Sequence, residues 1–390
     1  MTIAFTASTL YTPLEEISQP IVFVEDGRIT EVSSRAQKEI PKNVPLTDFG
    51  EAILAPGYVD IHLHGGAGLD VMLASPSELP RLGKFLIRHG VTGYFPTTVA
   101  APMAATCAAL ERMADAIEAA RASAKNSSGE VSAIPLGIHL EGPFLSHKRR
   151  GVHLPDNLVE PTVEVFDRLW QAARGEVHVL TIAPEIPGAL EVIAEASRRN
   201  VLVSIGHSDA ELPDAKAAFK AGARHATHTF NAMRPLDHRV PGILGEVLTN
   251  GQMSADIIVD GIHVAPEVVQ IFLDSKGVEQ AVLITDATAA TGMPDGRYYL
   301  GPMEVEVKDG KVTKDGSLAG SVLTMDRAVR NVTKFSDWSL RNAIRAATLN
   351  AAQAVGFAQH GRLEAGAEAN FAVMNAQGEV RKAIVRGQSN

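Results

Sequence analysis

The chain has 390 residues and a mass of 41.4 kDa; 45% of the residues are hydrophobic and 21% are charged, which is ordinary for a globular protein. The net charge of −9 and the pI near 5.8 argue against a nucleic-acid partner, which would require a basic face. The first residues lack the basic start and apolar core of a signal peptide, and no window approaches the roughly 20 apolar residues of a membrane span. The single cysteine, Cys107, cannot form an internal disulfide, so we expect a cytoplasmic protein.

The first fifty residues show the pattern of short strands. Ile21–Val24 and Ile29–Val32 alternate around Asp26-Gly27, which is a strong signal for a β-hairpin. The sequence therefore predicts that the chain begins in a small β domain, over residues 1–55.

The middle of the chain, residues 56–345, has a different pattern, in which apolar runs of strand length are each followed by a helical pattern. After the second run, for example, Leu110, Met113 and Ile117 recur at helical spacing. Strands that alternate with helices favour a parallel sheet closed into a (β/α)₈ barrel, an α/β fold of the TIM type. A doubly wound open sheet is the alternative, but its G-x-G-x-x-G fingerprint is missing from the sequence. The eight predicted strands are Tyr58–His64, Thr92–Thr98, Leu136–Glu141, His178–Ile182, Leu202–Gly206, His225–Thr229, Asp256–Val259 and Val282–Thr285.

Two further segments complete the predicted organisation. Asp309-Gly310 is a second hairpin signal and indicates a β-hairpin insertion near 298–325. Near the C-terminus, Phe371–Met374 and Ala383–Val385 read as strands on either side of a turn. We expect residues 346–390 to join residues 1–55 in one small β-sandwich domain. The run Lys125–Glu130 reads as a surface loop within the barrel.

Polar residues lie at the ends of five of the eight predicted barrel strands. In a barrel these carboxyl ends converge on one face, where barrel enzymes have their active sites. Neutral imidazole and carboxylate groups together suit Zn, Fe, Co or Ni, so the sequence predicts a metal site. His139 shares a face with Glu141 but reads as a neighbour of the site, and His225 faces away from His228. The residues at the strand ends are His62, His64, Glu141, His207, His228 and Asp286.

Basic residues are concentrated just beyond these strand ends. Lys148, Arg149, Arg150 and His153 follow Glu141, and Arg239 with its neighbour His238 follows the sixth strand. On a chain with a net charge of −9, this placement indicates an anionic ligand such as a phosphate. The alternative is that Lys148–Arg150 is a solvated surface loop.

Several motifs occur in an order that resembles the N-acetylglucosamine-6-phosphate deacetylase family of the amidohydrolase superfamily. HLEGPF and THTFNAM are the discriminating motifs, and the resemblance runs from about Pro56 to Gly320. The C-terminal GRLEAGAEANFAV is similar to the closing segment of the superfamily, but Asn370 stands where an aspartate is usual. The motifs are DIHLHGG, HLEGPF, IGHSDA, ATHTFNAM, DGIHV and TDA.

The resemblance implies hydrolysis of the N-acetyl group of N-acetylglucosamine-6-phosphate, in amino-sugar catabolism. Glu141, His207 and His228 would bind a divalent metal ion, with His62 and His64 as a possible second site. Zinc is the expected ion, with Fe, Co, Mn or Ni as alternatives, at one or two ions per subunit. Asp286 would act as the acid–base residue, because an amine leaves readily only when it is protonated.

The resemblance also implies a set of substrate contacts. His153 would hold the carbonyl oxygen, and His263 with Arg239 would contact the 6-phosphate. Arg239 would reach into the neighbouring subunit, so a homodimer is expected. The full set is Val152, His153, Asn231, Ala232, Arg239, Asp260, Gly261, Ile262, His263, Leu318, Ala319 and Gly320.

Three other functions are compatible with parts of the pattern. Deacetylation of N-acetylgalactosamine-6-phosphate differs only in the configuration of one hydroxyl, and the sequence does not separate the two. An amidohydrolase that acts on a cyclic amide would carry a carboxylated lysine on strand four, but HVLTIAPE contains no lysine. A non-catalytic relative would be expected to lose ligands, whereas Glu141, His207, His228 and Asp286 are all present.

Overall fold

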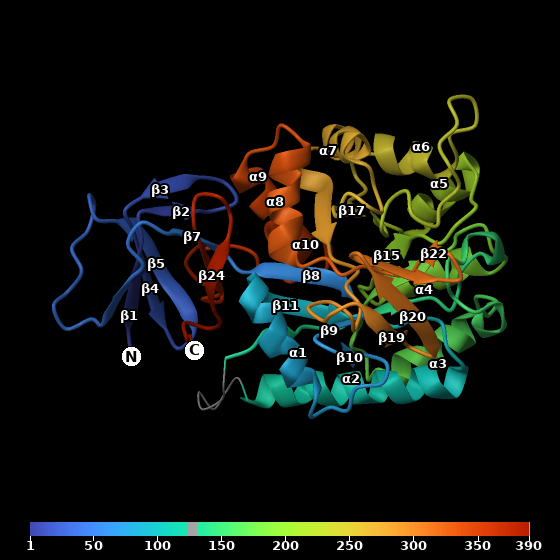
Figure 1. The fold of residues 1–390 in the computed structure, drawn as a ribbon, viewed down its shortest axis with the longest axis horizontal. Coiled ribbons are helices and arrows are strands. Elements are labelled where there is room, and N and C mark those ends of the chain that lie inside the picture. The colour runs from blue at the N-terminus through green and yellow to red at the C-terminus, as the bar shows by residue number, and fades with distance from the viewer. Residues whose placement is uncertain (124–130, 390) are drawn as a thin grey trace.

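The computed structural model describes residues 1–123 and 131–389, and the predicted loop Lys125–Glu130 lies outside them. The two chain ends lie together in a β-rich unit at one side of the molecule, and a larger barrel with its helices forms the other side (Figure 1). Among the described residues, no helix is both long enough and apolar enough to cross a membrane.

The β-rich unit is a sandwich of two sheets, as the sequence predicts. One sheet has the order β5-β4-β1-β6, and the other has the order β24-β23-β7-β2-β3, so strands from both chain ends share it. The predicted hairpin around Asp26-Gly27 joins β4 and β5, and the C-terminal hairpin joins β23 and β24. Between the sheets, Phe5, Leu54 and Phe371 are buried. The strands are β1 (Ile3–Thr6), β2 (Thr9–Tyr11), β3 (Glu16–Ser18), β4 (Pro20–Glu25), β5 (Arg28–Ser34), β6 (Leu46–Asp48), β7 (Ile53–Pro56), β23 (Phe371–Met374) and β24 (Val380–Ile384).

Eight parallel strands form the barrel at the predicted places in the chain. Ladders join β8 to β11, β13 through to β16, and β17 to β18. Single contacts close the gaps: Thr97 bridges to His139, the Thr229 N–H donates to the Asp256 carbonyl, and Leu63 bridges to Ala287. The barrel strands are β8 (Tyr58–Leu63), β11 (Val91–Pro96), β13 (Ile138–Glu141), β14 (Val177–Ile182), β15 (Leu202–Ile205), β16 (His225–Ala226), β17 (Ala255–Ile258) and β18 (Ala281–Ile284), with the short β9 (Gly65–Gly66), β10 (Leu69–Asp70) and β12 (Ile134–Pro135) beside them.

Several barrel strands are shorter than the sequence predicts, and the difference is largest at β16. The expected strand His225–Thr229 ends at Ala226, because the backbone of His228 takes a φ of 31° and that of Phe230 a φ of 79°. These left-handed values are incompatible with an extended strand. The chain turns there, and the Asn231 N–H donates to the His228 carbonyl at 2.9 Å.

The helices follow the strands and cover the barrel. Local signals set some of their starts: Thr162 caps α3 by accepting from the Val165 N–H, and Glu211 and Asp214 form a capping box on α5. The helices are α1 (Leu79–Leu86), α2 (Met103–Ser123), α3 (Val163–Ala172), α4 (Ala189–Arg198), α5 (Leu212–Ala221), α6 (Gly242–Thr249), α7 (Pro266–Gln280), α8 (Met325–Phe335), α9 (Leu340–Ala346) and α10 (Leu349–Ala354), with 3₁₀ turns η1 (Ile87–His89), η2 (His147–Arg149) and η3 (Pro155–Asn157).

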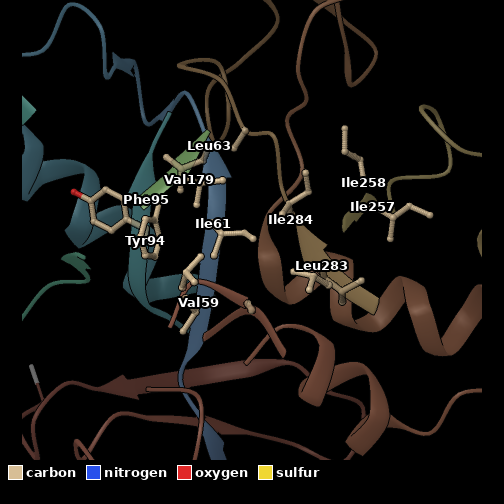
Figure 2. Packing of buried hydrophobic residues seen from close by; sticks show 14 of the residues in the cluster. Val59, Ile61, Leu63, Tyr94, Phe95, Val179, Ile257, Ile258, Leu283 and Ile284 are labelled. Atoms are coloured by element: carbon tan, nitrogen blue, oxygen red, sulfur yellow. The ribbon is translucent and has the colours of Figure 1, made fainter. Parts of the chain in front are cut away.

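Alternation along the strands separates the apolar core from the polar side chains of the site. Val59, Ile61 and Leu63 of β8 belong to one large buried cluster that also contains residues of β11, β17 and β18 (Figure 2). The residues between them on β8, Asp60 and His62, are also buried but point to the opposite face of the strand. The same short strand thus supplies both core packing and ligand chemistry.

A small antiparallel sheet lies between β18 and α8. Its strands are β19 (Gly296–Leu300), β20 (Met303–Lys308), β21 (Lys311–Lys314) and β22 (Ser317–Leu318). Asp309-Gly310 forms the turn between β20 and β21, where the sequence indicates a hairpin. The segment after β22 returns to the barrel, since the Ser321 N–H donates to the Asp286 carbonyl at 2.7 Å.

Candidate metal centre and active site

The six predicted residues all lie at the carboxyl ends of barrel strands. His62 is on β8, and His64 follows it directly; Glu141 is the last residue of β13. His207, His228 and Asp286 each stand two residues after the last residue of β15, β16 and β18, respectively. All six side chains are buried or nearly so. The barrel therefore brings residues from distant parts of the sequence to one site.

The backbone is strained at three of these positions. His207, His228 and Asp286 have φ values of 48°, 31° and 50°, in the left-handed region that residues other than glycine seldom adopt. Each such conformation costs roughly 1–3 kcal/mol and persists only where the surrounding structure enforces it. Here it turns the chain sharply at the strand end. Strain of this kind is concentrated at functional sites.

One group of potential ligands consists of Glu141, His207 and His228. Glu141 Oε1 lies 3.1 Å from His228 Nε2 and 3.2 Å from His207 Nε2. The two imidazole nitrogens are themselves 3.1 Å apart. Two imidazoles and one carboxylate are a donor set that suits a first-row divalent metal.

A second group shares the same carboxylate. His62 Nε2 and His64 Nε2 are 3.3 Å apart, and His64 Nε2 lies 3.4 Å from Glu141 Oε2. The ligand atoms within each group lie within 4.8 Å of one another. Asp286 Oδ1 adjoins this second group, at 3.1 Å from His64 Nε2 and 3.5 Å from His62 Nε2. Glu141 therefore belongs to both groups of potential ligands, and Asp286 lies beside the second group.

Backbone carbonyls orient two of the imidazoles for metal binding. The Nδ1–H of His64 donates to the Thr97 carbonyl and that of His207 to the Arg149 carbonyl, each at 3.0 Å. Since a carbonyl only accepts, Nδ1 carries a proton in both rings, and Nε2 has a free lone pair when the ring is neutral. Both lone pairs are on the nitrogens that face Glu141, so these residues fit a metal. The Nδ1 atoms of His62 and His228 have no hydrogen-bond partner within the described part of the chain.

Burial and charge set the protonation of the metal-free site. Burial raises the pKa of Glu141, but the surrounding His62, His207 and His228 outweigh it and hold that pKa well below its usual range. Burial lowers the pKa of His64 and of His228, yet Asp286 and Glu141 raise them to about 9. Burial dominates at His62 and lowers its pKa. The Glu141 carboxylate therefore stays ionised, as a metal ligand requires.

His139 is not available as a ligand, in agreement with the sequence analysis. Its Nδ1 donates to the Ile61 carbonyl at 3.0 Å, and its Nε2 bonds to Thr181 Oγ1 at 2.8 Å. His225 is also occupied, by Ser254 Oγ at 2.6 Å and Asp256 Oδ2 at 2.9 Å. These two histidines belong to the polar interior that supports the site.

The neutral ring of His153 can donate a hydrogen bond toward the site through Nε2. The Ala100 N–H donates to His153 Nδ1 at 3.1 Å, so in the neutral ring the proton is on Nε2. That Nε2 lies 3.7 Å from Glu141 Oε2. Burial, followed by the neighbouring His207, lowers the pKa of His153 to about 3, which keeps the ring neutral. The ring can therefore donate to a carbonyl oxygen next to the metal groups.

The inserted segment lies against Asp286. A methyl group on Gly320, which has a φ of 64°, would be 3.0 Å from the Asp286 carbonyl oxygen and 2.6 Å from the Thr288 side chain. Leu318 pairs with Thr313 across β21 and β22, and the buried Ala319 stands between Leu318 and Gly320. This part of the predicted substrate set thus directly adjoins the predicted acid–base residue.

Other predicted contacts come from three loops. Asn231 Nδ2 donates to the His228 carbonyl at 3.3 Å, and Ala232 has a φ of 50°. Asp260 organises the turn that contains Gly261: its Oδ1 accepts from the N–H groups of Ile262 and His263, and its Oδ2 lies 2.7 Å from His263 Nδ1. Val152 is half-buried beside His153. Arg239 is exposed and lies in the loop that precedes α6.

The sequence leaves two readings of the basic segment after Glu141, an anion site or a solvated loop, and in the structure two of its cations contact an acidic residue. Arg149 Nε donates to Asp209 Oδ1 at 2.9 Å, and Lys148 Nζ lies 3.4 Å from Asp209 Oδ2. Both cations are therefore paired with an acidic residue of this chain. Sequence reasoning missed Asp209 and its neighbour Glu185, because the only signal is the position of Asp209 two residues after His207.

Comparisons with known proteins agree with this architecture. The model of the amidohydrolase family matches residues 53–389. The N-acetylglucosamine-6-phosphate deacetylase of Lysinibacillus sphaericus is 36% identical over 358 residues, which cover 91% of this chain and 89% of that protein. The N-acetylgalactosamine-6-phosphate deacetylase of Escherichia coli O157:H7 is 37% identical over 350 residues, which cover 89% of this chain and 90% of that protein.

A solved structure is similar over the whole chain. It is a mutant of N-acetyl-D-glucosamine-6-phosphate deacetylase from Mycobacterium smegmatis, in complex with N-acetyl-D-glucosamine-6-phosphate. It superposes with a TM-score of 0.90 at 33% identity and covers 100% of this chain and 99% of that one. Together with the site geometry, these similarities place the chain in the amidohydrolase family and, within it, in the N-acetylglucosamine-6-phosphate deacetylase family.

Proposed function

We propose that this protein hydrolyses the N-acetyl group of N-acetylglucosamine-6-phosphate, giving glucosamine-6-phosphate and acetate, in amino-sugar catabolism. The observation that carries the proposal is the sharing of Glu141 by two histidine pairs, with Asp286 Oδ1 3.1 Å from His64 Nε2. This is a site for metal-assisted hydrolysis, and near full-length relatives named for this deacetylation support the choice of substrate.

The metal ligands in this proposal are the two groups that share Glu141. His207 and His228 would hold one divalent ion, and His62 and His64 a second. Imidazole and carboxylate donors suit Zn, with Fe, Co, Mn or Ni as alternatives. When bound, such an ion supplies Lewis acidity toward the amide carbonyl and makes a coordinated water more acidic.

Asp286 would provide the proton transfers. Its carboxylate takes a proton from the water that adds to the amide carbon, and then gives this proton to the sugar nitrogen as the C–N bond breaks. Its side chain is only 10% exposed, so bulk water competes little for this proton. His153, which is neutral and protonated on Nε2, would donate to the carbonyl oxygen as negative charge develops there.

The phosphate contacts in this proposal are His263 and Arg239. Asp260 binds Nδ1 of His263 at 2.7 Å and so fixes this ring beside the barrel mouth. Arg239 is exposed in the single chain, with its loop neighbours Leu236 and Val240 53% and 52% exposed. An arginine so far exposed, flanked by exposed apolar side chains, suits a homodimer in which Arg239 completes the partner's site.

N-Acetylgalactosamine-6-phosphate is a second candidate substrate. The specific observation in its favour is the 37% identity to a relative named for that activity. The two sugars share the amide and the phosphate and differ at one hydroxyl, so the metal groups and Asp286 would serve both.

Acetate release tests the proposed function directly. The metal-loaded protein is assayed with both phosphorylated sugars and with their unphosphorylated forms, before and after chelator treatment. We expect faster release from the gluco 6-phosphate, little from the unphosphorylated sugars, and recovery after metal is added back. Equal rates on phosphorylated and unphosphorylated sugars would contradict the proposed substrate, and full activity after verified removal of metal would contradict the proposed chemistry.

A further inference from the structure

Three loops of the site meet at one largely buried carboxylate, that of Asp209. Its side chain is 13% exposed, and it accepts from Arg149 Nε at 2.9 Å and from an Arg234 terminal nitrogen at 3.2 Å. Arg149 belongs to the loop after β13, Asp209 to the loop after β15 and Arg234 to the loop after β16. The same three loops contain His153, His207 and His228, respectively.

The contact with Arg149 reaches the imidazole of His207. The guanidinium of Arg149 donates to Asp209, and the backbone carbonyl of Arg149 accepts from His207 Nδ1–H at 3.0 Å. A second bond runs between the same loops, from the Ser146 N–H to the His207 carbonyl at 3.0 Å. Displacement of Arg149 would therefore move the acceptor that fixes the tautomer and the orientation of His207.

Asp209 is itself held on its other side. Glu185 accepts from the Asp209 N–H and from the Ser208 hydroxyl, each at 2.7 Å. Arg234 Nε donates to the Asp209 carbonyl at 2.8 Å. Backbone and side chain of Asp209 are thus both fixed by charged groups, which is more than a surface ion pair provides.

We propose that Asp209 is a positioning residue for His207, acting through Arg149. Its carboxylate holds the Arg149 guanidinium, and the Arg149 carbonyl then keeps Nε2 of His207 directed at Glu141. The inference rests on the metal-ligand role of His207 in the proposed function. Partners of ligating histidines typically change metal affinity by about 10- to 100-fold when they are altered.

The test compares Asp209→Asn with Asp115→Asn, both in a His64→Gln background so that only the Glu141–His207–His228 group remains. Asp115 forms an exposed ion pair with Arg174 at 2.7 Å on α2, away from the site loops. Zn²⁺ and Co²⁺ affinities are measured by chelator competition, and the cobalt absorption spectrum reports the ligand geometry. We expect Asp209→Asn to weaken binding about tenfold and alter the spectrum, and Asp115→Asn to change neither.

A second variant covers the case in which Asp209→Asn fails to fold. Arg149→Gln removes the same contact but keeps the backbone carbonyl, and we expect a similar loss of affinity, with little further loss in the double variant. Unchanged metal affinity and spectrum in a folded Asp209→Asn or Arg149→Gln protein, even with lowered thermal stability, would overturn the inference. Absence of acetate release by the wild-type protein would instead overturn the proposed function, since metal affinity is measured without substrate.

Discussion

Asp286 and the metal ligands are neighbours with different expected roles. The described ligand groups are His62–His64–Glu141 and Glu141–His207–His228, and Asp286 lies beside the first of them. Asp286→Asn replaces the carboxylate with an amide of the same shape that cannot accept a proton. This substitution should therefore lower kcat about 10²- to 10⁴-fold. Metal content, measured by elemental analysis, should stay at the wild-type level. Loss of metal together with activity would make Asp286 a ligand first and an acid–base residue second.

The sharing of Glu141 predicts two ions per chain under saturating supply. His64 supplies one of only two imidazoles of the second group, and its Nε2 lies 3.3 Å from that of His62. His64→Gln should therefore reduce the stoichiometry from two ions to one, measured by elemental analysis of protein purified without chelator. A wild-type stoichiometry of one that His64→Gln leaves unchanged would rule out the second site.

Metal binding should strengthen as the pH rises. In the metal-free site burial lowers the pKa of His64 and of His228, but Asp286 and Glu141 raise both to about 9, so an incoming ion must displace these protons. Between pH 7 and 9 the apparent affinity should rise by up to about tenfold per pH unit for each displaced proton. Isothermal titration in buffers of different ionisation enthalpy measures both affinity and proton release. An affinity that is constant over this range would contradict the predicted protonation.

His64 and His228 also make the stability of the metal-free protein depend on pH, and this stability falls as the pH rises. Their folded-state pKa values exceed the unfolded value of about 6.5, so their stabilising contribution is complete below that pH. It is lost as the pH rises through about 9. Metal-free protein should thus lose part of its stability over the interval in which metal binding becomes stronger.

Substitutions at two glycines near the end of the inserted sheet can distinguish the effect of backbone strain from the effect of contact with the active site. Gly316 and Gly320 have φ values of 80° and 64°, but a methyl group on Gly316 meets nothing within 4 Å, whereas one on Gly320 would be 2.6 Å from Thr288. Gly316→Ala should cost about 1 kcal/mol of stability with kcat unchanged. Gly320→Ala should cost more and also lower kcat, because the segment would press on the loop that begins with Asp286.

Thermal unfolding and steady-state kinetics of both variants measure the difference. Equal kcat values would show that the inserted segment does not influence Asp286. A matched loss of kcat in Gly316→Ala would instead attribute the effect to the strain of the whole sheet.

The elements of this fold were predictable where one local signal decides them. Asp26-Gly27 specifies a turn through its own conformational preference, and alternating residues mark β8 as a strand with Ile61 on one face and His62 on the other. The end of β16 was not predictable, because His228 adopts a φ of 31° only when the surrounding barrel enforces it. Local propensity alone extends this strand to Thr229.

The same distinction applies to the site. Residue types and strand ends were enough to name Glu141, His207 and His228 as neighbours, since barrel topology brings strand ends together. Tautomers were not predictable, because the carbonyls of Thr97 and Arg149 that fix them come from other loops. The pairing of Arg149 with Asp209 was missed for the same reason: the two residues are 60 positions apart, and no local pattern connects them.

The β-sandwich formed by the two chain ends and the barrel differ in what they contain. The sandwich of both ends has its own buried cluster around Phe5 and Phe371, and the metal groups lie at the strand ends of the barrel. Arg239, by contrast, is on an exposed loop with exposed Leu236 and Val240 beside it. A subunit interface over this loop would bury the apolar pair and bring the guanidinium to a second site.

Mixing two chains that are each impaired tests that arrangement. Arg239→Ala should lower activity on the 6-phosphate about ten- to a hundredfold, the worth of one charge-assisted contact, and leave activity on unphosphorylated sugar nearly unchanged. In a heterodimer with an Asp286→Asn chain, the Arg239→Ala chain keeps its own Asp286 and receives Arg239 from its partner. Random exchange makes about half of the dimers heterodimers, each with one intact site, so about a quarter of wild-type activity should return. No recovery after subunit exchange has been verified would place Arg239 in the site of its own chain or outside both sites.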